Sequence, residues 1–326
     1  MPTLTVVCPA YKEEEVVGEF CQELLAVLTR LGDRWRFHVL FVVDRGTDRT
    51  LEILRASAAR YPAVGVLALS ARFGQQAALL AGLDHCDSDA VITMDCDLQH
   101  PPSLIPALLE GFEHGYDVVY TVREDGPGMP TLKRLTSRWF YRLLDRMSDT
   151  SIVEGAADFR LLSRRVVELF QSRIRERSLF LRGLVSWVGF PSLAVRFEAQ
   201  PRRAGRTKFP LRSMMRFGLE GVVAFSRSPL RAALYSGVVL FATGAGVAGV
   251  SLARRWLEGV SPGPWTWMGA LLLSLAGLNL LFLGVLGEYV AAVLVEARAR
   301  PHYVIDERIN LPPPVDRSGS ARTRPG

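Results

Sequence analysis

The sequence contains little cysteine and little histidine, and neither residue is grouped. Its four cysteines include no C-x-x-C pair, which excludes a zinc ribbon and a thioredoxin-type redox pair. We expect these thiols to stay reduced. The five histidines show no metal-binding spacing and no Ser/His/Asp arrangement. A G-x-G-x-x-G loop is also missing after the first predicted strand, which argues against a dinucleotide-binding enzyme.

Charge is nearly absent from two long segments toward the end of the chain. Residues 230–253 and 265–295 each exceed the roughly 20 residues needed to cross a bilayer core, so we predict two transmembrane helices. Two buried helices of a soluble core are the alternative, but soluble helices rarely stay apolar on all sides over such a length. Glycines in the first segment would permit close helix packing, and hence a homo-oligomer.

The flanking sequences predict the orientation of these two segments. Arginines precede the first and follow the second, whereas the link between them carries two arginines and one glutamate, so both ends are expected inside. The N-terminus lacks the features of a signal peptide. We therefore expect a multi-pass protein of the inner or plasma membrane, with residues 1–210 as a cytoplasmic domain. Residues 296–326 are expected to form a cytoplasmic tail with a disordered, Pro-, Ser- and Arg-rich end.

The net charge of +6 and the pI near 9.4 admit nucleic acid, anionic lipid or phosphate-bearing substrates as partners. Because the basic residues gather beside the predicted spans and no nucleic-acid motif is present, we exclude nucleic acid. Two basic amphipathic stretches, 131–147 and 211–229, are predicted to lie as interfacial helices on anionic headgroups. An ordinary surface helix packed on the sheet is the alternative for the first.

Residues 3–121 alternate short β-branched runs with helical patterns. This alternation predicts an α/β fold with a mostly parallel sheet covered by helices on both faces. In such sheets, ligands bind at the carboxyl ends of the strands. Strands are expected at 4–8, 38–43, 64–69, 90–94 and 117–120, and helices at 14–31, 48–60, 75–85 and 102–114.

Two aspartates follow the predicted strand at 90–94, in the stretch MDCDLQHPP (94–102). Asp95 and Asp97 are therefore expected at a strand end, in the ligand-binding region. Together with Gln99, they offer hard oxygen ligands that suit a Mg²⁺ or Mn²⁺ ion carrying a substrate diphosphate. The alternative is that Asp97 only caps the helix that follows.

The same stretch resembles the motif M-D-A-D-L-Q-x-P-P of family 2 glycosyltransferases, and specifically of the polyprenyl-phosphate sugar transferases related to dolichol-phosphate mannose synthase and to bacterial undecaprenyl-phosphate glucosyl and arabinosyl transferases. The resemblance covers nearly the whole chain in order. Further matching stretches are FGQQAALLAGLD (73–84), YDVVYTVR (116–123), ADFRLLSRRVV (157–167), RSLFLRGLVSWVGF (177–190), RRAGRTKF (202–209), FSRSPLR (225–231) and GEYV (287–290).

This resemblance implies a GT-A-like, metal-dependent, inverting enzyme that transfers a sugar from a nucleotide-diphosphate sugar to undecaprenyl or dolichyl phosphate. The departing nucleoside diphosphate would need a divalent cation and fixed positive groups. The implied residues are Asp95, Asp97 and Gln99 for Mg²⁺ or Mn²⁺; Asp158, Asp97 and Gln99 for catalysis; Pro9, Tyr11, Glu13, Asp44, Arg202 and Lys208 for the donor; and Arg160 and Arg182 for the acceptor phosphate.

Several of these implied roles have alternatives. An acceptor phosphate is ionised near neutral pH, with a second pKa of about 6, so Asp158 is either a general base or an orienting group. Arg160 and Arg182 suit bidentate phosphate contacts, but each could instead form a structural ion pair. Arg202 and Lys208 match the family's R-x-x-G-x-[ST]-K pattern, and a solvated basic loop is the alternative.

The chain departs from the family pattern mainly in the loops after the first three strands, which by resemblance cradle the donor nucleoside. We expect altered donor binding, because the changes add positive charge and leave Asp44 as the candidate base-recognition carboxylate. An inactive relative that serves as a membrane scaffold or regulator is the rival, although the metal motif is retained. A processive polysaccharide synthase would need more spans and a Q-x-x-R-W motif. The departures are Lys12, Val43, Arg45, Gly46, Ala71, Arg72 and Ala199.

Overall fold

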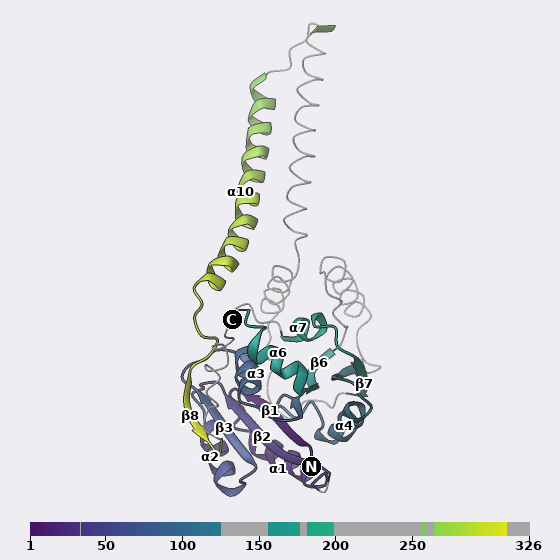
Figure 1. Cartoon of the computed structure of the whole chain (residues 1–326). Helices are drawn as coiled ribbons and strands as arrows, with labels where there is room; N and C mark the ends of the chain where they lie inside the picture. Colours follow the sequence, from purple (N-terminus) through teal and green to yellow (C-terminus); the bar gives the residue numbers. More distant parts are fainter. Residues whose placement is uncertain (33, 125–155, 177–180, 199–255, 258–263, 312–326) are drawn as a thin grey trace, which may run out of the picture. The chain divides into compact units, whose positions relative to one another are not determined.

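The computed structural model describes residues 1–32, 34–124, 156–176, 181–198, 256–257 and 264–311. These residues belong to two units. The described residues up to 198, together with 300–311, form the first unit, and 256–257 and 264–299 belong to the second. An eight-stranded sheet organises the first unit (Figure 1).

The centre of this sheet is parallel. Strands β3, β2, β1 and β4 lie side by side, and each pairs with its neighbour in parallel. These strands are rich in valine, leucine and isoleucine, which fits a sheet that is covered on both faces. In sheet order the strands are β7 (Ser192–Glu198), β5 (Val118–Glu124), β6 (Ala156–Ser163), β4 (Ala90–Thr93), β1 (Thr3–Ala10), β2 (Arg36–Val43), β3 (Val64–Leu69) and β8 (Ile305–Ile309).

Antiparallel pairs occur on both sides of the parallel centre. β6 lies between β4 and β5 and runs antiparallel to both, while β5 and β7 are parallel. β8 runs antiparallel to β3 at the other edge. The predicted α/β fold with a mostly parallel sheet is confirmed, and the antiparallel β6 is the strand that brings a later part of the chain beside β4.

Helices cover both faces of the sheet. On one face, Phe20 and Leu24 of α1 belong to the core that contains Val6 of β1. On the other face α3 approaches β1 so closely that a Cβ on Gly82 would lie 2.2 Å from Cγ1 of Val7. Only glycine allows this approach. The helices are α1 (Val17–Thr29), α2 (Thr50–Arg60), α3 (Gln75–Asp84), the 3₁₀ turn η1 (Pro102–Leu104), α4 (Ile105–Glu113), α6 (Arg164–Ser172) and α7 (Leu181–Trp187).

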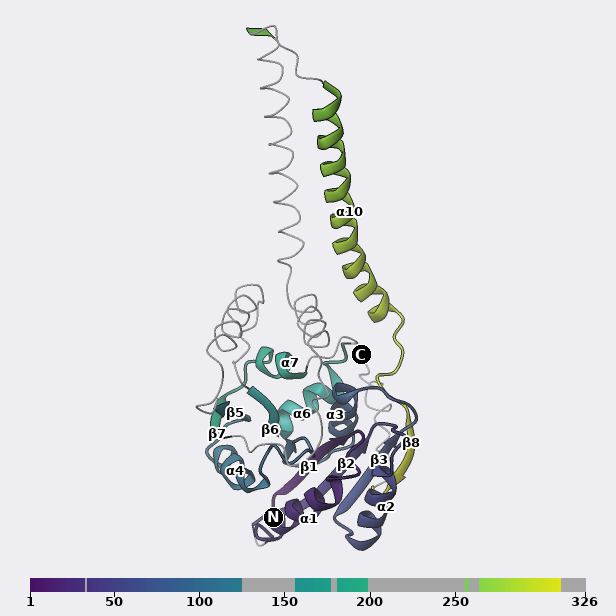
Figure 2. The same cartoon turned by 180° about the vertical axis from the view of Figure 1, so that it is seen from behind.

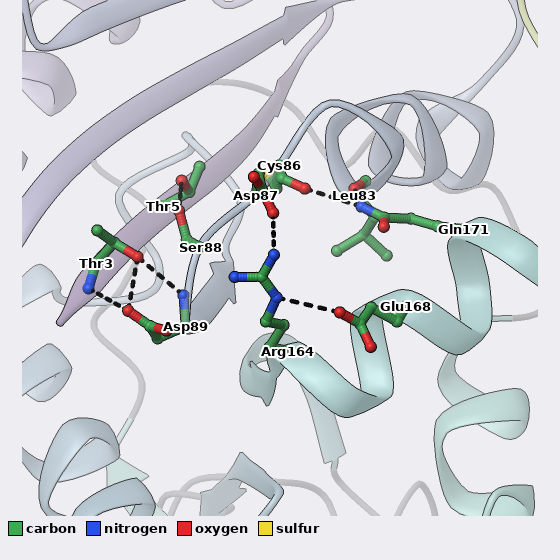
Figure 3. Close-up of polar contacts among 10 residues, drawn as sticks. All are labelled: Thr3, Thr5, Leu83, Cys86, Asp87, Ser88, Asp89, Arg164, Glu168 and Gln171. Atoms are coloured by element: carbon green, nitrogen blue, oxygen red, sulfur yellow. Dashed lines mark hydrogen bonds and ion pairs between the residues drawn. The ribbon is translucent and has the colours of Figure 1, made fainter. Parts of the chain in front are cut away.

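Helix α6 is anchored to the connection between α3 and β4 (Figure 3). The side-chain amide of Gln171 donates to the carbonyl oxygens of Leu83, at 2.7 Å, and Cys86, at 2.9 Å. Arg164, the first residue of α6, pairs with Asp87. Because α6 directly follows β6 in the chain, these contacts help to hold β6 against β4.

The segment that follows residue 299 joins the edge of the sheet, where the sequence predicted only a tail. β8 pairs with β3 from Val66↔Ile309 onward (Figure 2). Tyr303 donates its hydroxyl hydrogen to Asp84 at 2.7 Å, and Arg55 pairs with Glu307. We call residues 300–311 the C-terminal strap.

The second unit contributes helix α10 (Pro264–Ala297). None of the helices in the described part of the chain combines the length and the apolar character needed to cross a membrane. The predicted span at 230–253 and the predicted interfacial helices at 131–147 and 211–229 lie outside the described residues.

Candidate active site

The carboxyl ends of the parallel strands meet at one edge of the sheet. Ala10 at the end of β1 is opposite Val43 at the end of β2, and Val7 of β1 is opposite Thr93 at the end of β4. The loops that follow these strands are therefore neighbours, as the sequence predicted. Because β6 runs antiparallel with Arg160 opposite Thr93, the beginning of β6 lies at the same edge.

The two motif aspartates lie in the loop directly after β4. Asp95 accepts a hydrogen bond at Oδ1 from the side-chain amide of Gln75, at 2.7 Å. Asp97 accepts one at Oδ1 from the backbone N–H of Gln99, at 3.1 Å, which is a local turn of the kind that aspartate side chains form. The following turn, η1, has Pro101 as its N-cap and no side-chain capping bond. The structure thus gives Asp97 no capping role at η1.

The loop that carries the aspartates has an unusual backbone. Leu98, between Asp97 and Gln99, has a φ of 59°, in the left-handed region that costs a non-glycine residue roughly 1–2 kcal/mol. Its side chain is buried in the core, which offsets this cost. Cys96 donates its thiol hydrogen to the carbonyl oxygen of Pro9, at 3.2 Å, and burial raises the pKa of Cys96 well above its usual range. Cys96 is therefore a neutral packing residue.

Asp158 and Arg160 form an ion pair at the start of β6. The distance from Oδ1 of Asp158 to Nη2 of Arg160 is 3.2 Å, and both side chains are largely buried. The backbone carbonyl of Asp158 accepts the hydroxyl hydrogen of Thr93, at 2.7 Å. Arg160 thus has the structural ion pair that the sequence left open. Its contact with an acceptor phosphate stays a prediction.

Asp44, the predicted base-recognition carboxylate, binds the loop between β3 and α3. Its Oδ1 accepts the backbone N–H of Phe73 at 2.7 Å, and its Oδ2 accepts that of Gly74 at 2.8 Å. The side chain is buried, with Asp44 only 3% exposed. Asp44 therefore has a structural role that the sequence did not predict. Its contact with the base of a donor stays a prediction.

The other predicted donor residues lie at or after the end of β1. Pro9 is within β1, opposite Val42. Tyr11 follows the strand, and the backbone N–H of Glu13 donates to the hydroxyl of Thr50 at 2.9 Å. This bond connects the β1 loop to the first residue of α2.

Three of the departures from the family pattern also lie in these loops. Arg72 stacks on Tyr11, with its Cζ 4.3 Å from the ring centroid, and the Nζ of Lys12 is 5.7 Å from the same centroid. Arg45 donates to the carbonyl oxygen of Ser70 at 2.9 Å. Lys12 has a φ of 56°, in the left-handed region that residues other than glycine adopt only uncommonly. Lys12 and Arg72 thus lie beside the same aromatic ring, and altered donor binding stays a prediction.

The structure describes no contacts for the remaining residues that were predicted to bind phosphates. Arg182 is the second residue of α7, in the first unit. Arg202 and Lys208 lie outside the described residues, as do the basic stretches predicted to meet the membrane. Their roles stay predictions.

The carboxylate oxygens in the loop after β4 suit a divalent cation that is coordinated jointly by the protein and by a substrate diphosphate. Mg²⁺ is commonly held by one or two carboxylates plus substrate phosphates, and Asp95 and Asp97 can supply those carboxylates. Within the described ranges, no group of three His, Cys, Asp or Glu side chains could hold a metal ion by itself. In the same ranges the Nε2 atom of Gln99 is buried without a hydrogen-bond partner, so a ligand oxygen would satisfy it.

Sequence reasoning missed two residues that the structure places at this edge. The first is Gln75, which donates a hydrogen bond to Asp95. The second is His100, whose ring centroid lies 5.6 Å from that of Phe159 and 5.8 Å from that of Phe197. The signal for Gln75 was its position in FGQQ at the start of a helix that follows a strand. His100 gave no such signal, because its partners come from distant strands.

Fold and site together define an α/β enzyme with paired carboxylates at the carboxyl ends of parallel strands. Residues 5–170 match the model of Glycosyl transferase family 2, and the chain belongs to this family. The predicted GT-A-like class of fold agrees with this membership, and the chain is a glycosyltransferase.

Known relatives match almost the whole chain. An uncharacterised glycosyltransferase of Bacillus subtilis, YkcC, is 37% identical over 307 residues, which cover 94% of each chain. A protein of Shigella phage SfV named bactoprenol glucosyl transferase is 36% identical over 309 residues, covering 93% of this chain and 97% of the relative. Among solved structures, mannosyl-3-phosphoglycerate synthase of Rubrobacter xylanophilus covers 72% of this chain and 75% of its own at 18% identity, with a TM-score of 0.46.

Proposed function

We propose that this glycosyltransferase transfers a sugar from a nucleotide-diphosphate sugar to a polyprenyl phosphate, such as undecaprenyl or dolichyl phosphate, with inversion at the anomeric carbon. The observation that carries the proposal is the placement of Asp95 and Asp97, which follow β4, at the same edge of the sheet as Asp158 near the beginning of β6. The similarity to a protein named bactoprenol glucosyl transferase over 93% of the chain supports the lipid acceptor.

A Mg²⁺ or Mn²⁺ ion, held by Asp95 and Asp97 with Gln99 beside them, would stabilise the negative charge of the departing nucleoside diphosphate. The reaction is a single displacement. An oxygen of the acceptor phosphate forms a bond to the anomeric carbon while the bond from that carbon to the diphosphate oxygen breaks. Because the attacking oxygen is already ionised near neutral pH, no proton needs to leave it.

Asp158 acts mainly as an orienting group in this proposal. Its ion pair with Arg160 fixes the carboxylate at the start of β6, and the bond from Thr93 to its backbone ties it to β4. Arg182, Arg202 and Lys208 are proposed to bind the phosphates. Arginine suits such contacts because its planar guanidinium binds two phosphate oxygens at once.

The donor is proposed to bind beside the loops after β1, β2 and β3, where Tyr11 and Glu13 lie. Lys12, Arg45 and Arg72 make this region more cationic than the family pattern, so we propose a donor preference different from that of typical relatives. Two of these cations lie near the Tyr11 ring, so they and Tyr11 would contact the same part of the donor.

The enzyme is proposed to reside in the plasma or inner membrane with its catalytic unit on the cytoplasmic side. The nearly uncharged sequence at 230–253 supports this proposal. Large apolar side chains of α10, such as Leu272, Leu283 and Val293, are exposed in the structure. Apolar surface of this kind is stable in contact with lipid rather than water. Separation of membranes from cytosol, followed by alkaline extraction, tests the location, and recovery in the cytosol contradicts it.

The direct test is transfer of radiolabelled sugar from a panel of UDP- and GDP-sugars to undecaprenyl or dolichyl phosphate. Purified full-length protein is assayed with Mg²⁺ or Mn²⁺, and Asp97→Ala is compared with Asp87→Ala. Asp87 is an exposed aspartate that pairs with Arg164 (Figure 3), and it precedes β4, away from the carboxyl ends of the strands. Label in the lipid phase that needs the metal ion and Asp97, but not Asp87, is the expected result.

Two other outcomes would contradict the proposal. Substantial activity of Asp97→Ala would remove this residue from the metal site. If folded wild-type protein transfers nothing from any donor, the changed donor loops mean lost catalysis, and a membrane scaffold becomes the better explanation.

A further inference from the structure

Four consecutive residues, 73–76, connect three parts of the active site. They form a junction in which residues 73 and 74 end the connection after β3, and residues 75 and 76 begin α3. The first two bind Asp44 at the end of β2 through their backbone N–H groups. Gln75 binds Asp95 after β4, and Gln76 accepts the backbone N–H of Leu181, the first residue of α7, at 3.1 Å.

This junction is itself firmly held. Gly74 is the N-cap of α3 and has a φ of 95°, a conformation that other residues rarely adopt. From Ala77 to Leu83 every residue of α3 is buried. The backbone at Gln75 is thus fixed on one side by the carboxylate of Asp44 and on the other by a buried helix.

We propose that Gln75 is the positioning residue for the metal carboxylate Asp95. Its side-chain amide donates to Oδ1 of Asp95 at 2.7 Å, so it selects one orientation of the carboxylate before any ligand binds. Groups that orient a metal-binding carboxylate in this way typically change metal affinity or activity by roughly 10–100-fold when they are removed. This inference rests on the proposed role of Asp95 in holding the ion.

The competing explanation is that Gln75 only stabilises the start of α3. The two roles differ in what they change: a structural role lowers the stability of the fold, whereas a positioning role weakens metal binding by protein that remains folded. A matched control is available in Gln171. Its amide donates two hydrogen bonds, to Leu83 and Cys86, at the opposite end of α3 (Figure 3).

The test is Mn²⁺ binding to the full-length protein in detergent, measured by electron paramagnetic resonance with Mn²⁺ alone and with Mn²⁺ plus UDP. Wild type is compared with Gln75→Met and Gln171→Met, because methionine matches glutamine in length and lacks the amide. Thermal unfolding of each variant is recorded in parallel. We expect Gln75→Met to bind Mn²⁺ about tenfold or more weakly, and Gln171→Met to bind it as wild type does.

Equal Mn²⁺ affinity of Gln75→Met and wild type would overturn the inference, as would an equal loss in both variants. It would also fall if wild type bound no Mn²⁺ with or without UDP. Should Gln75→Met not fold, Gln75→Asn replaces it; its amide is one methylene short of Asp95, and the same weakening is expected. If Gln75→Met weakens Mn²⁺ binding while wild type transfers no sugar to a lipid, the proposed transferase activity is wrong and the positioning role stands.

Discussion

Asp158 and Arg160 form a buried ion pair at the beginning of β6, with 3.2 Å between Oδ1 and Nη2. Both residues come from one short stretch of an antiparallel strand, and this strand places them beside the end of β4. The pair explains why an arginine that is only 5% exposed is tolerated in the sheet. A substitution of either residue therefore also leaves the other without its partner in this ion pair.

The first prediction concerns the role of Asp158. Because the acceptor phosphate is already ionised at neutral pH, we expect Asp158→Asn to lower kcat by less than about 100-fold at pH 8. General acid–base catalysis typically contributes about 10²–10⁴-fold to the rate, so the loss of a true general base would be larger. The fold-loss should stay about the same as pH falls toward 6, because protonation of the acceptor phosphate slows wild type and variant alike if Asp158 only orients. Steady-state rates between pH 6 and 8 measure this. A loss of about 10³-fold or more at pH 8 would instead identify Asp158 as a general base.

The second prediction concerns Arg160. Arg160→Met keeps the bulk of the side chain but removes a positive charge from beside a buried carboxylate. Breaking a buried pair typically costs about 3–5 kcal/mol, so we expect a clear fall in the free energy of unfolding. The exposed Arg164, which pairs with Asp87 and Glu168, is the control, and Arg164→Met should cost about 1 kcal/mol or less. Urea unfolding compares the two, and equal costs would contradict the importance of the buried pair.

The third prediction concerns the C-terminal strap. The hydroxyl of Tyr303 donates to Asp84, which also binds Arg175 at 2.7 Å. Tyr303→Phe removes a hydrogen bond to a charged group and should cost about 1.5–3 kcal/mol of unfolding free energy near pH 7. Urea unfolding followed by the fluorescence of the sheet-containing unit measures this cost. No change in stability would show that the strap does not support the sheet edge.

The stability lost in Tyr303→Phe should also depend on pH, in a direction that the pKa of Tyr303 sets. Burial, and then the charge of Asp84, raise the pKa of Tyr303 above its usual range. The unfolded chain therefore releases this proton at lower pH than the folded protein does, so the stability that Tyr303 contributes is fully present below pH of about 10 and is lost above it. The difference between wild type and Tyr303→Phe should narrow as pH rises beyond 10. A constant difference from pH 7 to 11 would contradict the raised pKa.

The sequence predicted the parallel half of the sheet because its strands are continuous buried runs. The strand predicted at 64–69 coincides with β3, and the helix predicted at 75–85 ends one residue later than α3. β8 escaped prediction, because Ile305–Ile309 has three consecutive charged residues between its two isoleucines and its partner β3 is far away in the sequence. Local patterns cannot show such long-range pairing.

The sequence predicted where the motif aspartates lie in the sheet, but not which residues contact them. The rule that ligands bind at the carboxyl ends of strands placed Asp95 and Asp97 correctly at that edge of the sheet. The bond from Gln75, the left-handed backbone of Leu98 and the amide partners of Asp44 all depend on tertiary packing, which no local pattern contains. The family motif named the carboxylates, whereas the residues that hold them required the structure.

The last prediction concerns the cations near Tyr11. If Arg72 and Tyr11 contact the donor together, Arg72→Asn should raise the KM for the preferred nucleotide-sugar about 10- to 150-fold, because one charge-assisted contact is worth roughly 1.5–3 kcal/mol, and should change kcat much less. Arg60 is a matched control, since its Cζ stacks on Tyr61 at 5.2 Å at the far end of α2. Arg60→Asn should leave the KM unchanged, so a difference between the two arginines cannot come from losing a cation–π contact alone.

Donor kinetics at low and moderate salt measure both variants, and the salt dependence of the KM should weaken only in Arg72→Asn. If both variants keep the wild-type KM for every donor in the panel, the departures in these loops do not reach the donor, and its selection must lie with residues elsewhere in the chain.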